Sequence, residues 1–416
     1  MSNRKFLRSF RFLTAQAVDS SMTPASRQGN HTPARLRCLA RRSAVTSRVL
    51  QFAGGLGAIV MALAGSGCRK HEPLPRPYLA FVVNNQSQSI AVVDMASTRI
   101  VATVPVAPFP ETAVRRPMSN EIYVVSTSGK ISILRYPEMT IAAAIDIGQS
   151  AHELVFSPDG SRAYALDPQA GQIVLIDCAS RKVTGSVNLV PNLSHLAITP
   201  DGTTLIASDP SGNRLFFVGA DPLKELGTVK VGKEPEPLVV SRDGSEVFVA
   251  DTGEEKISSV EISSRTVLAH IEMGSKPSGL VLKPDGGELF VLSDEASTVT
   301  IIDASHDNVE QVLPVGRDPF AAAFTRDSSI MYLATAGDGF VTAFDVSSRT
   351  VKSTLHVGVE PEALALTPDE RFLAVADSAS GSLAIVRTSP LSLVTVIPVG
   401  ENPVEVLIPG WEQSQR

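Results

Sequence analysis

VFVADTGEEKISSVEISSRTVLAHIEMGSKPSGLVLKPDG (Val247–Gly286) decides the fold, because one unit later the chain repeats its pattern as LFVLSDEASTVTIIDASHDNVEQVLPVGRDPFAAAFTRDS (Leu289–Ser328). Both stretches consist of short apolar runs rich in β-branched residues, separated by clusters of Gly, Pro, Asp and Ser. Such runs are typical of strands joined by tight turns, and a helical period is absent. The repeated unit is therefore predicted to be a small antiparallel sheet.

Three residue series recur with a common period of 42 residues. They comprise aspartates at Asp159, Asp201, Asp243, Asp285, Asp327 and Asp369, glycines at Gly232, Gly274, Gly316, Gly358 and Gly400, and prolines at Pro235, Pro277, Pro319, Pro361 and Pro403. We interpret all three as turn residues. Four strands in about 42 residues are typical of one blade of a β-propeller.

Counting the repeats predicts an all-β propeller of eight four-stranded blades over residues 78–410. The units begin near Tyr78, Ile122, Ala163, Leu205, Val247, Leu289, Met331 and Phe372. An innermost strand is missing before the first unit, because HEPLPRP (71–77) holds three prolines. The stretch NPVEVLIPG (402–410) supplies it, so the C-terminal strand should complete the first blade and close the ring. Seven blades with an aberrant first unit is the alternative.

The quoted motifs resemble the YVTN family of bacterial, exported β-propeller repeats. The matching segments are Val247–Ala250, Pro277–Gly286, Val299–Asp303 and Val309–Gly316. The resemblance covers about residues 76–410. It implies the propeller fold, and it implies little about function, because the repeated residues are structural.

Residues 39–68 resemble an export signal. Arg41, Arg42 and Arg48 precede an apolar run from Val49 to Ala64. LAGSGC then ends in Cys68, which resembles the lipidated cysteine of a bacterial lipoprotein. Cleavage after Ala62-Leu63-Ala64, or retention as an anchor helix, is the alternative. We expect a periplasmic protein or a membrane-anchored lipoprotein, with the membrane contacted only through the lipid.

The flanking segments are expected to lie outside the propeller. Residues 1–38 are basic and either lack structure or precede the true start, which mass spectrometry of the N-terminus would decide. Residues 69–77 form a Pro-rich linker, and residues 411–416 form a tail.

Composition excludes several function classes. Residues 71–416 hold 25 basic and 42 acidic residues, a formal charge of −17 that disfavours nucleic-acid binding and favours a cationic or basic partner. The three cysteines form no CxxC or CxxCH motif, which disfavours a structural zinc site, a c-type heme and a disulfide framework. We expect a monomer.

The loops that enter the innermost strands should gather at one mouth of the central channel. Aligned positions place there Glu111, His152, Glu153, His195, Glu236, Glu362 and Glu405. Carboxylates and imidazoles could bind a cation, with His152, Glu153 and His195 as candidate metal ligands. The alternative is that the carboxylates are solvated turn residues and the histidines cap turns.

The sequence contains no GxSxG, HExxH or P-loop motif, so no catalytic residue and no cofactor are predicted. We expect a non-enzymatic, exported platform that binds a protein or an envelope polymer. The alternative is a metal-dependent hydrolase resembling the propeller lactonases, with Glu111, His152, Glu153 or His195 around the metal. A redox subunit whose partner brings the cofactor is a third hypothesis.

Overall fold

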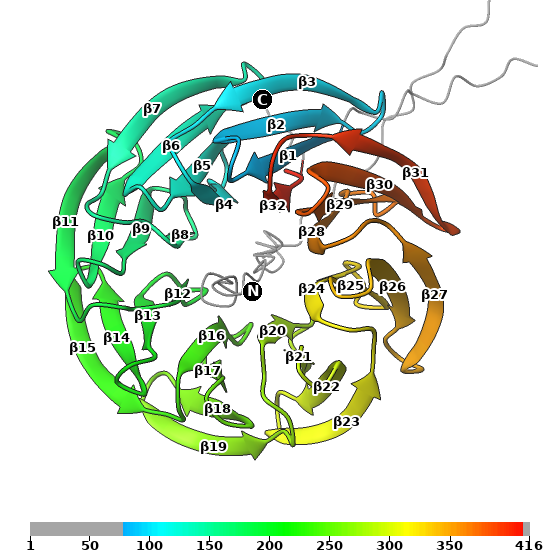
Figure 1. The fold of residues 1–416 in the computed structure, drawn as a ribbon. Helices are drawn as coiled ribbons and strands as arrows, with labels where there is room; N and C mark the ends of the chain where they lie inside the picture. Colours follow the sequence, from blue (N-terminus) through cyan, green and yellow to red (C-terminus); the bar gives the residue numbers. More distant parts are fainter. Residues whose placement is uncertain (1–77, 411–416) are drawn as a thin grey trace, which may run out of the picture. The chain divides into compact units, whose positions relative to one another are not determined.

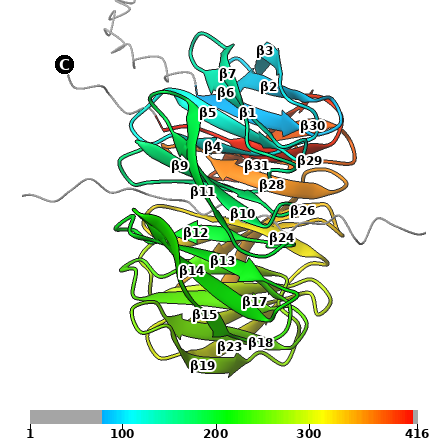
Figure 2. The ribbon, with the colours of Figure 1, turned by 90° about the vertical axis from the view of Figure 1, so that its left-hand side faces the viewer.

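The computed structural model describes residues 78–410, which form eight four-stranded antiparallel sheets. The sheets are the blades of a ring, with one strand of each blade nearest the ring axis and another at the rim (Figure 1). In the view turned by 90°, loops project at both faces of the ring (Figure 2). The eight-bladed all-β propeller is confirmed, and the seven-blade alternative is wrong. The expected leader, export signal, lipidated Cys68, linker and tail lie outside the described residues.

Blades 1 to 4 contain the following strands: β32 (Pro403–Leu407), β1 (Leu79–Asn84), β2 (Ser89–Asp94) and β3 (Arg99–Pro105); β4 (Pro110–Arg115), β5 (Glu121–Ser126), β6 (Lys130–Arg135) and β7 (Thr140–Asp146); β8 (Leu154–Phe156), β9 (Arg162–Asp167), β10 (Gln172–Asp177) and β11 (Lys182–Asn188); β12 (Leu196–Ile198), β13 (Thr204–Asp209), β14 (Arg214–Ala220) and β15 (Leu223–Lys230).

Blades 5 to 8 contain the following strands: β16 (Pro235–Val240), β17 (Glu246–Asp251), β18 (Lys256–Glu261) and β19 (Thr266–Glu272); β20 (Gly279–Leu282), β21 (Glu288–Ser293), β22 (Thr298–Asp303) and β23 (Asn308–Pro314); β24 (Pro319–Phe324), β25 (Ile330–Thr335), β26 (Phe340–Asp345) and β27 (Thr350–His356); β28 (Pro361–Leu366), β29 (Phe372–Asp377), β30 (Ser382–Thr388) and β31 (Leu391–Pro398). Each blade is written from its innermost to its outermost strand.

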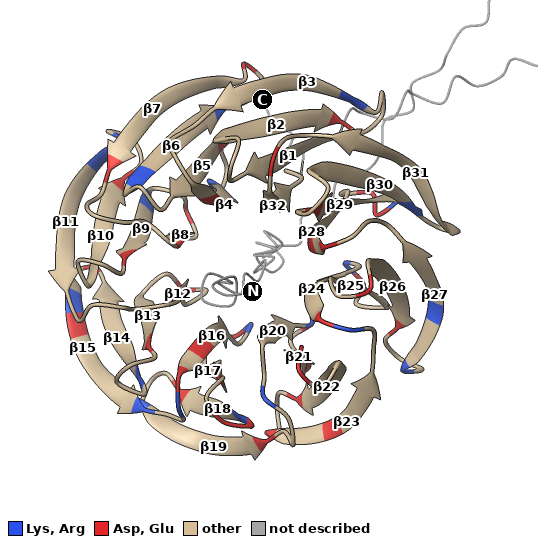
Figure 3. Cartoon of the chain, viewed as in Figure 1, with Lys and Arg blue, Asp and Glu red and all other residues tan. Residues whose placement is uncertain are grey.

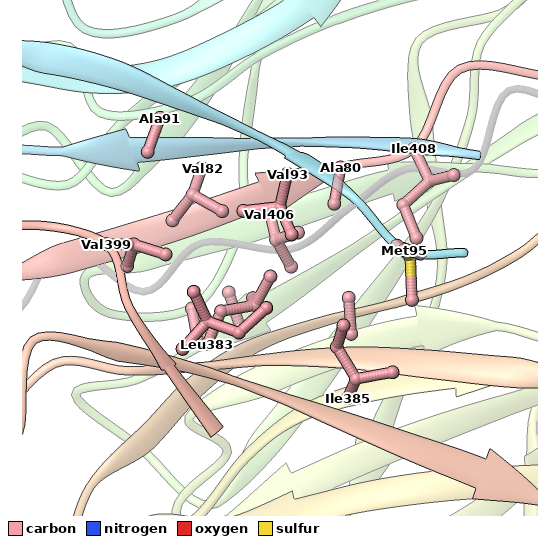
Figure 4. Packing of buried hydrophobic residues seen from close by; sticks show 14 residues of the cluster. Ala80, Val82, Ala91, Val93, Met95, Leu383, Ile385, Val399, Val406 and Ile408 are labelled. Carbon is pink, nitrogen blue, oxygen red and sulfur yellow. The ribbon is translucent and has the colours of Figure 1, made fainter. Parts of the chain in front are cut away.

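The C-terminal strand closes the ring as the sequence predicted. β32 pairs antiparallel with β1, with Val82 opposite Val406 and Phe81 opposite Leu407. Val406 is fully buried in an apolar cluster that joins blade 1 to Leu383 and Ile385 of blade 8 (Figure 4). The first and last parts of the propeller therefore share one sheet and one core.

Burial follows the position of a strand within its blade. In blade 5, Val247–Asp251 of β17 are buried on both faces, whereas β19 at the rim alternates between exposed and covered residues. Neighbouring blades pack face to face over the inner strands, so these strands need apolar residues on both sides. Within residues 78–410 there is no helix with the length and hydropathy that a bilayer span requires.

The period-42 aspartates cap the turns between the first and second strands. The Asp159 carboxylate accepts hydrogen bonds from the Ser161 amide at 3.0 Å and the Ser157 hydroxyl at 2.6 Å. Asp243 accepts from Ser245 and Ser241 in the same way. The prediction that this series consists of turn residues is confirmed.

Ion pairs join neighbouring blades at a repeated position. The first residue of the second strand in one blade pairs with the residue that comes just before the outermost strand of the next blade. Arg181 Nη2 lies 2.6 Å from Glu121 Oε1, and Arg349 pairs in the same way with Glu288. Burial opposes ionisation of Glu121, but the hydrogen bonds and charges of Arg181 and Arg116 lower its pKa overall. These pairs stabilise the seams between blades.

The seam between blades 5 and 6 departs from this rule. Asp307 occupies the position of Arg181 and Arg349, so it faces a carboxylate, Glu246. Ser259 donates to Glu246 Oε2 at 3.1 Å, and Asp307 Oδ1 is buried without a hydrogen-bond partner. Burial raises the pKa of both carboxyl groups, and the charge of Asp307 raises that of Glu246 further. The seam is thus destabilised when both groups ionise.

Asp307→Arg should therefore stabilise the propeller, by about 1 kcal/mol at neutral pH. Arg181 and Arg349 occupy the equivalent position with φ of 55° and 57°, close to the 54° of Asp307, so the backbone should accept arginine. Groups with a raised pKa bind protons in the folded state, so wild-type stability falls as pH rises through those pKa values. The stabilisation by Asp307→Arg, measured by urea unfolding, should therefore increase as the pH rises through those pKa values. Asp307→Asn is the control, and an equal gain from it would show that no ion pair forms.

Candidate functional site

Two sets of loops meet at the face of the ring that holds the candidate site. One set leads from an outermost strand to the innermost strand of the next blade, and the other joins the second and third strands. Their contact is visible at Asp167, which follows the second strand of blade 3 and accepts the amides of Gln149 and Ser150 at 2.9 and 3.2 Å. We call the first set the mouth loops.

Three glycines at positions of the 42-residue period, Gly148, Gly358 and Gly400, have a specific reason in this contact, whereas a Cβ on Gly274 would meet no atom within 4 Å. A Cβ on Gly148 would overlap the Asp167 carboxylate, and one on Gly358 would overlap that of Asp377. At Gly400 the added atom would lie 2.7 Å from the Asn84 side chain. These glycines are therefore more than turn formers, because each leaves room for the side chain that holds its mouth loop.

His152 and Glu111 form a pair across blades 2 and 3. His152 lies just before β8, and its Nδ1 is 3.2 Å from Oε2 of Glu111 on β4. The His152 side chain is 35% exposed, and within residues 78–410 its Nε2 has no hydrogen-bond partner. A carboxylate that accepts the Nδ1 proton holds an imidazole with its Nε2 lone pair directed outward, as in metal-bound histidines.

Glu153 and His195 form a more buried pair across blades 3 and 4. Nδ1 of His195 lies 3.2 Å from Glu153 Oε1, and Glu153 Oε2 also accepts the Leu196 amide. Burial opposes protonation of His195, but the charge and hydrogen bond of Glu153 and the charge of Glu236 raise its pKa. The raised pKa favours the protonated form of His195, and its contact with Glu153 joins blades 3 and 4.

Two further ring residues bridge blades in the same manner. Glu405 on β32 accepts the Ala113 amide at 2.8 Å, and Ser194 donates to Glu236 on β16. The contacts run from blade 1 to blade 5 and link successive innermost strands. Glu362 occupies the equivalent position on β28 in blade 8, which packs beside β32.

The ring does not form a protein-only metal cage in the described part of the chain. Among residues 78–410, no group of three or more His, Cys, Asp or Glu side chains is placed to hold an ion. The two histidines instead pair separately with Glu111 and Glu153. Each histidine could therefore supply a single ligand, which suits a metal ion whose other coordination positions are already occupied.

Sequence reasoning missed the mouth-loop residues that lie two or three positions before the ring. Phe109 and Val359 are exposed apolar side chains, at 54% and 63%. Lys233, Lys276 and Arg317 place positive charge on three successive loops, those of blades 5, 6 and 7. Figure 3 shows both charge signs on the loops around the channel. Reading the period-42 alignment two and three positions earlier would have found these residues.

The comparisons relate this propeller to heme proteins. Residues 284–409 match the family described as Cytochrome D1 heme domain. The chain is similar in structure to dihydro-heme d1 dehydrogenase NirN in complex with DHE, at 15% identity and a TM-score of 0.71, over 83% of this chain and 78% of that one. No curated protein matches the sequence.

Two other solved structures are also similar. Kuenenia stuttgartiensis hydrazine synthase matches at 16% identity and a TM-score of 0.56, over 67% of this chain and 96% of that one. A functionally unknown protein from Desulfotomaculum acetoxidans DSM 771 matches at 16% identity and 0.56, over 70% and 99%. At these identities the structures support the propeller fold. These comparisons support a propeller and do not show the YVTN repeat type.

The match to the heme domain contradicts the predicted function. A plain non-enzymatic binding platform was expected, with a lactonase-like hydrolase as the alternative, and residues 284–409 instead resemble a heme-binding propeller. The expectation failed because a site assembled from single residues on several blades leaves no local motif. The matched segment runs from just before β21 of blade 6 through blades 7 and 8 to β32, so this chain is similar to that family over part of its ring.

Proposed function

We propose that the propeller binds a heme-type tetrapyrrole at the channel mouth, with His152 as the iron ligand. The observation that carries this proposal is the His152–Glu111 pair, in which a half-exposed imidazole is oriented by a carboxylate. The class of cofactor comes from the match of residues 284–409 to the Cytochrome D1 heme domain. A bound heme would supply one-electron transfer and an exchangeable axial position.

The residues at the mouth fit such a group. Phe109 and Val359 offer apolar contact to a flat macrocycle, and Lys233, Lys276 and Arg317 could pair with its carboxylates. The acidic side of the mouth would oppose an anionic ligand. Glu111, Glu153 and Glu236 are, however, engaged with His152, His195 and Ser194. The carboxylates of the ligand should therefore face blades 5 to 7.

Within this site the chain has three tasks. Oε2 of Glu111 lies 3.2 Å from Nδ1 of His152, so a proton held between these two atoms would leave Nε2 as the donor atom. The Glu153–His195 pair and the Ser194–Glu236 contact keep the mouth loops at a constant distance. Phe109 and Val359 would exclude water from the face of a bound macrocycle.

Hemin binding to the full chain tests this proposal. Titration followed by the Soret band should show saturable 1:1 binding, and His152→Ala should weaken it at least about tenfold and shift the band. Glu111→Gln should weaken binding less. His306→Ala is the matched control, because that histidine is 74% exposed and lies outside the mouth, beside Asp303.

Two outcomes would overturn the assignment. Equal affinity and an unchanged spectrum in His152→Ala would remove His152 as the ligand. A wild-type chain that takes up no hemin would remove the heme proposal as a whole.

A further inference from the structure

Aspartates or related polar residues hold the mouth loops at equivalent positions in several blades. Asp167 in blade 3 accepts the loop amides of Gln149 and Ser150 and the turn amide of Ala170. Asp377 in blade 8 accepts the amides of Val359 and Glu360, with Ser380 in its turn. In both blades a carboxylate accepts hydrogen bonds from two consecutive amides of the mouth loop.

Asp251 is the counterpart in blade 5, and its surroundings differ. Its side chain is fully buried, and Oδ1 has no hydrogen-bond partner. The two amides of this mouth loop that correspond to those bound by Asp167 and Asp377 donate to other residues. Lys233 N–H donates to Glu254 Oε1 at 3.1 Å, and Glu234 N–H donates to Asn213 Oδ1 at 3.1 Å.

The carboxyl group nevertheless lies against the loop. A Cβ added to Gly232 would lie within 2.5 Å of Asp251 Oδ2. The loop backbone can approach the carboxyl group this closely only because residue 232 has no side chain. A small movement of the loop would therefore bring its amides to the unpartnered oxygen. The loop could thus adopt two arrangements. In the observed one its amides donate to Glu254 and Asn213, and in the other they would donate to Asp251.

Titration of Asp251 in the neutral range supports two states. Burial raises the pKa of Asp251 to about 7, with a further rise from the charge of Glu254, against the hydrogen bonds of the Ser258 hydroxyl and the Gly232 amide and the opposing charge of Lys256. Asp167 is also buried, yet its amide hydrogen bonds lower its pKa. The difference in loop contacts therefore accounts for the difference between the two carboxyl groups.

A hydrogen-bonded path connects Asp251 to solvent. Ser258 Oγ lies 2.7 Å from Asp251 Oδ2 and 2.9 Å from Nδ1 of His270, which is exposed on β19. When Asp251 is neutral, its O–H can donate to Ser258, which donates to His270. When Asp251 is ionised, His270 N–H can donate to Ser258, which donates to the carboxylate. The hydroxyl stands between acid and imidazole, so this is a proton path and not a nucleophile with its base.

We propose that Asp251 is a proton-controlled latch for the mouth loop 232–235. With Asp251 neutral, the loop amides remain on Glu254 and Asn213. With Asp251 ionised, the carboxylate takes the amides of Lys233 and Glu234, as Asp167 and Asp377 do in their blades. The charged groups that face this carboxyl are Glu254, Lys256, Lys233 and Glu234, with His270 behind Ser258. Because the loop leads directly into Glu236, the latch adjusts one side of the channel mouth whatever ligand binds there.

Amide hydrogen exchange of the full chain between pH 5.5 and 8.5 tests the latch. After correction for intrinsic exchange, protection of Lys233 and Glu234 should change roughly threefold or more, with a midpoint near the pKa of Asp251. The loops at 149–150 and 359–360 serve as internal controls and should show no such step. Asp251→Asn should hold loop 232–235 in its low-pH state at every pH.

A second measurement keeps the test valid if Asp251→Asn folds poorly. The side-chain carbon signal of Asp251 in the wild-type protein should titrate in the neutral range, together with the Lys233 and Glu234 amides. Asp377→Asn should loosen loop 359–360 and leave the step at 232–235 intact. An ionised Asp251 down to pH 5, or a loop that does not respond when Asp251 titrates, would overturn the proposal.

Discussion

A chain that stops after Glu401 should fail to form a cooperatively folded ring, which is the largest effect we expect. β32 supplies the innermost strand of blade 1, and its Val406 belongs to the core shared by blades 1 and 8. Its loss would expose the edge of β1 and the apolar surface beside Leu383. Open edges and uncovered apolar surface favour aggregation. Circular dichroism during urea unfolding and size-exclusion chromatography would measure the loss.

A chain that ends at Gly410 is the matched control and should unfold like the full-length protein. Val406→Asp gives an independent test if the truncated chain is degraded, because it places a charge at a fully buried position in the same strand. We expect a loss of about 4 kcal/mol or more from the unfolding free energy. A single transition at the wild-type midpoint after removal of β32 would show that blade 1 does not depend on it.

Gly358→Ala should lower the unfolding free energy by about 2–4 kcal/mol, through overpacking and the disturbed cap of the mouth loop. The added Cβ would overlap the Asp377 carboxylate, which is buried and accepts the amides of Val359 and Glu360. Either the loop or the aspartate must move, and these hydrogen bonds must weaken. Urea unfolding would give the change in stability, and hydrogen exchange of residues 359–360 would locate it.

Gly185→Ala is the control for the intrinsic effect of replacing glycine. Gly185 lies on the outermost strand β11, where an added Cβ meets no atom within 4 Å. That substitution should be neutral or slightly stabilising, because alanine restricts the unfolded chain. Equal effects at Gly358 and Gly185 would contradict the role assigned to the glycine series.

The sequence predicted where the residues of the candidate site lie along the strands, but it did not predict which of them contact each other. The period of 42 residues correctly aligned the positions of Glu111, His152, Glu153 and His195 at the starts of the innermost strands. It could not show that the ring divides into pairs across blades, such as His152 with Glu111. Those pairs depend on the conformations of two mouth loops and on the spacing between blades.

The same limit applies to residues that look equivalent in the alignment. Asp167 and Asp251 follow the second strands of their blades, and the repeat assigns them one role. The structure shows that Asn213 and Glu254 take the amides of loop 232–235, which leaves Asp251 with an unpartnered oxygen. Asp307 departs from Arg181 and Arg349 in a comparable way, because the residue it meets lies on another blade.

The amino-acid sequence by itself determined the propeller, the number of blades and the strand that closes the ring. These features follow from strand patterns and turn residues that recur within each unit, and the missing first strand has one candidate, residues 402–410. Only the tertiary structure decided which mouth residues pair, which carboxyl groups share a seam and which aspartate lacks its loop. The physical reason is that these properties arise between blades, from side chains about 20 to 60 residues apart whose distances no local pattern encodes.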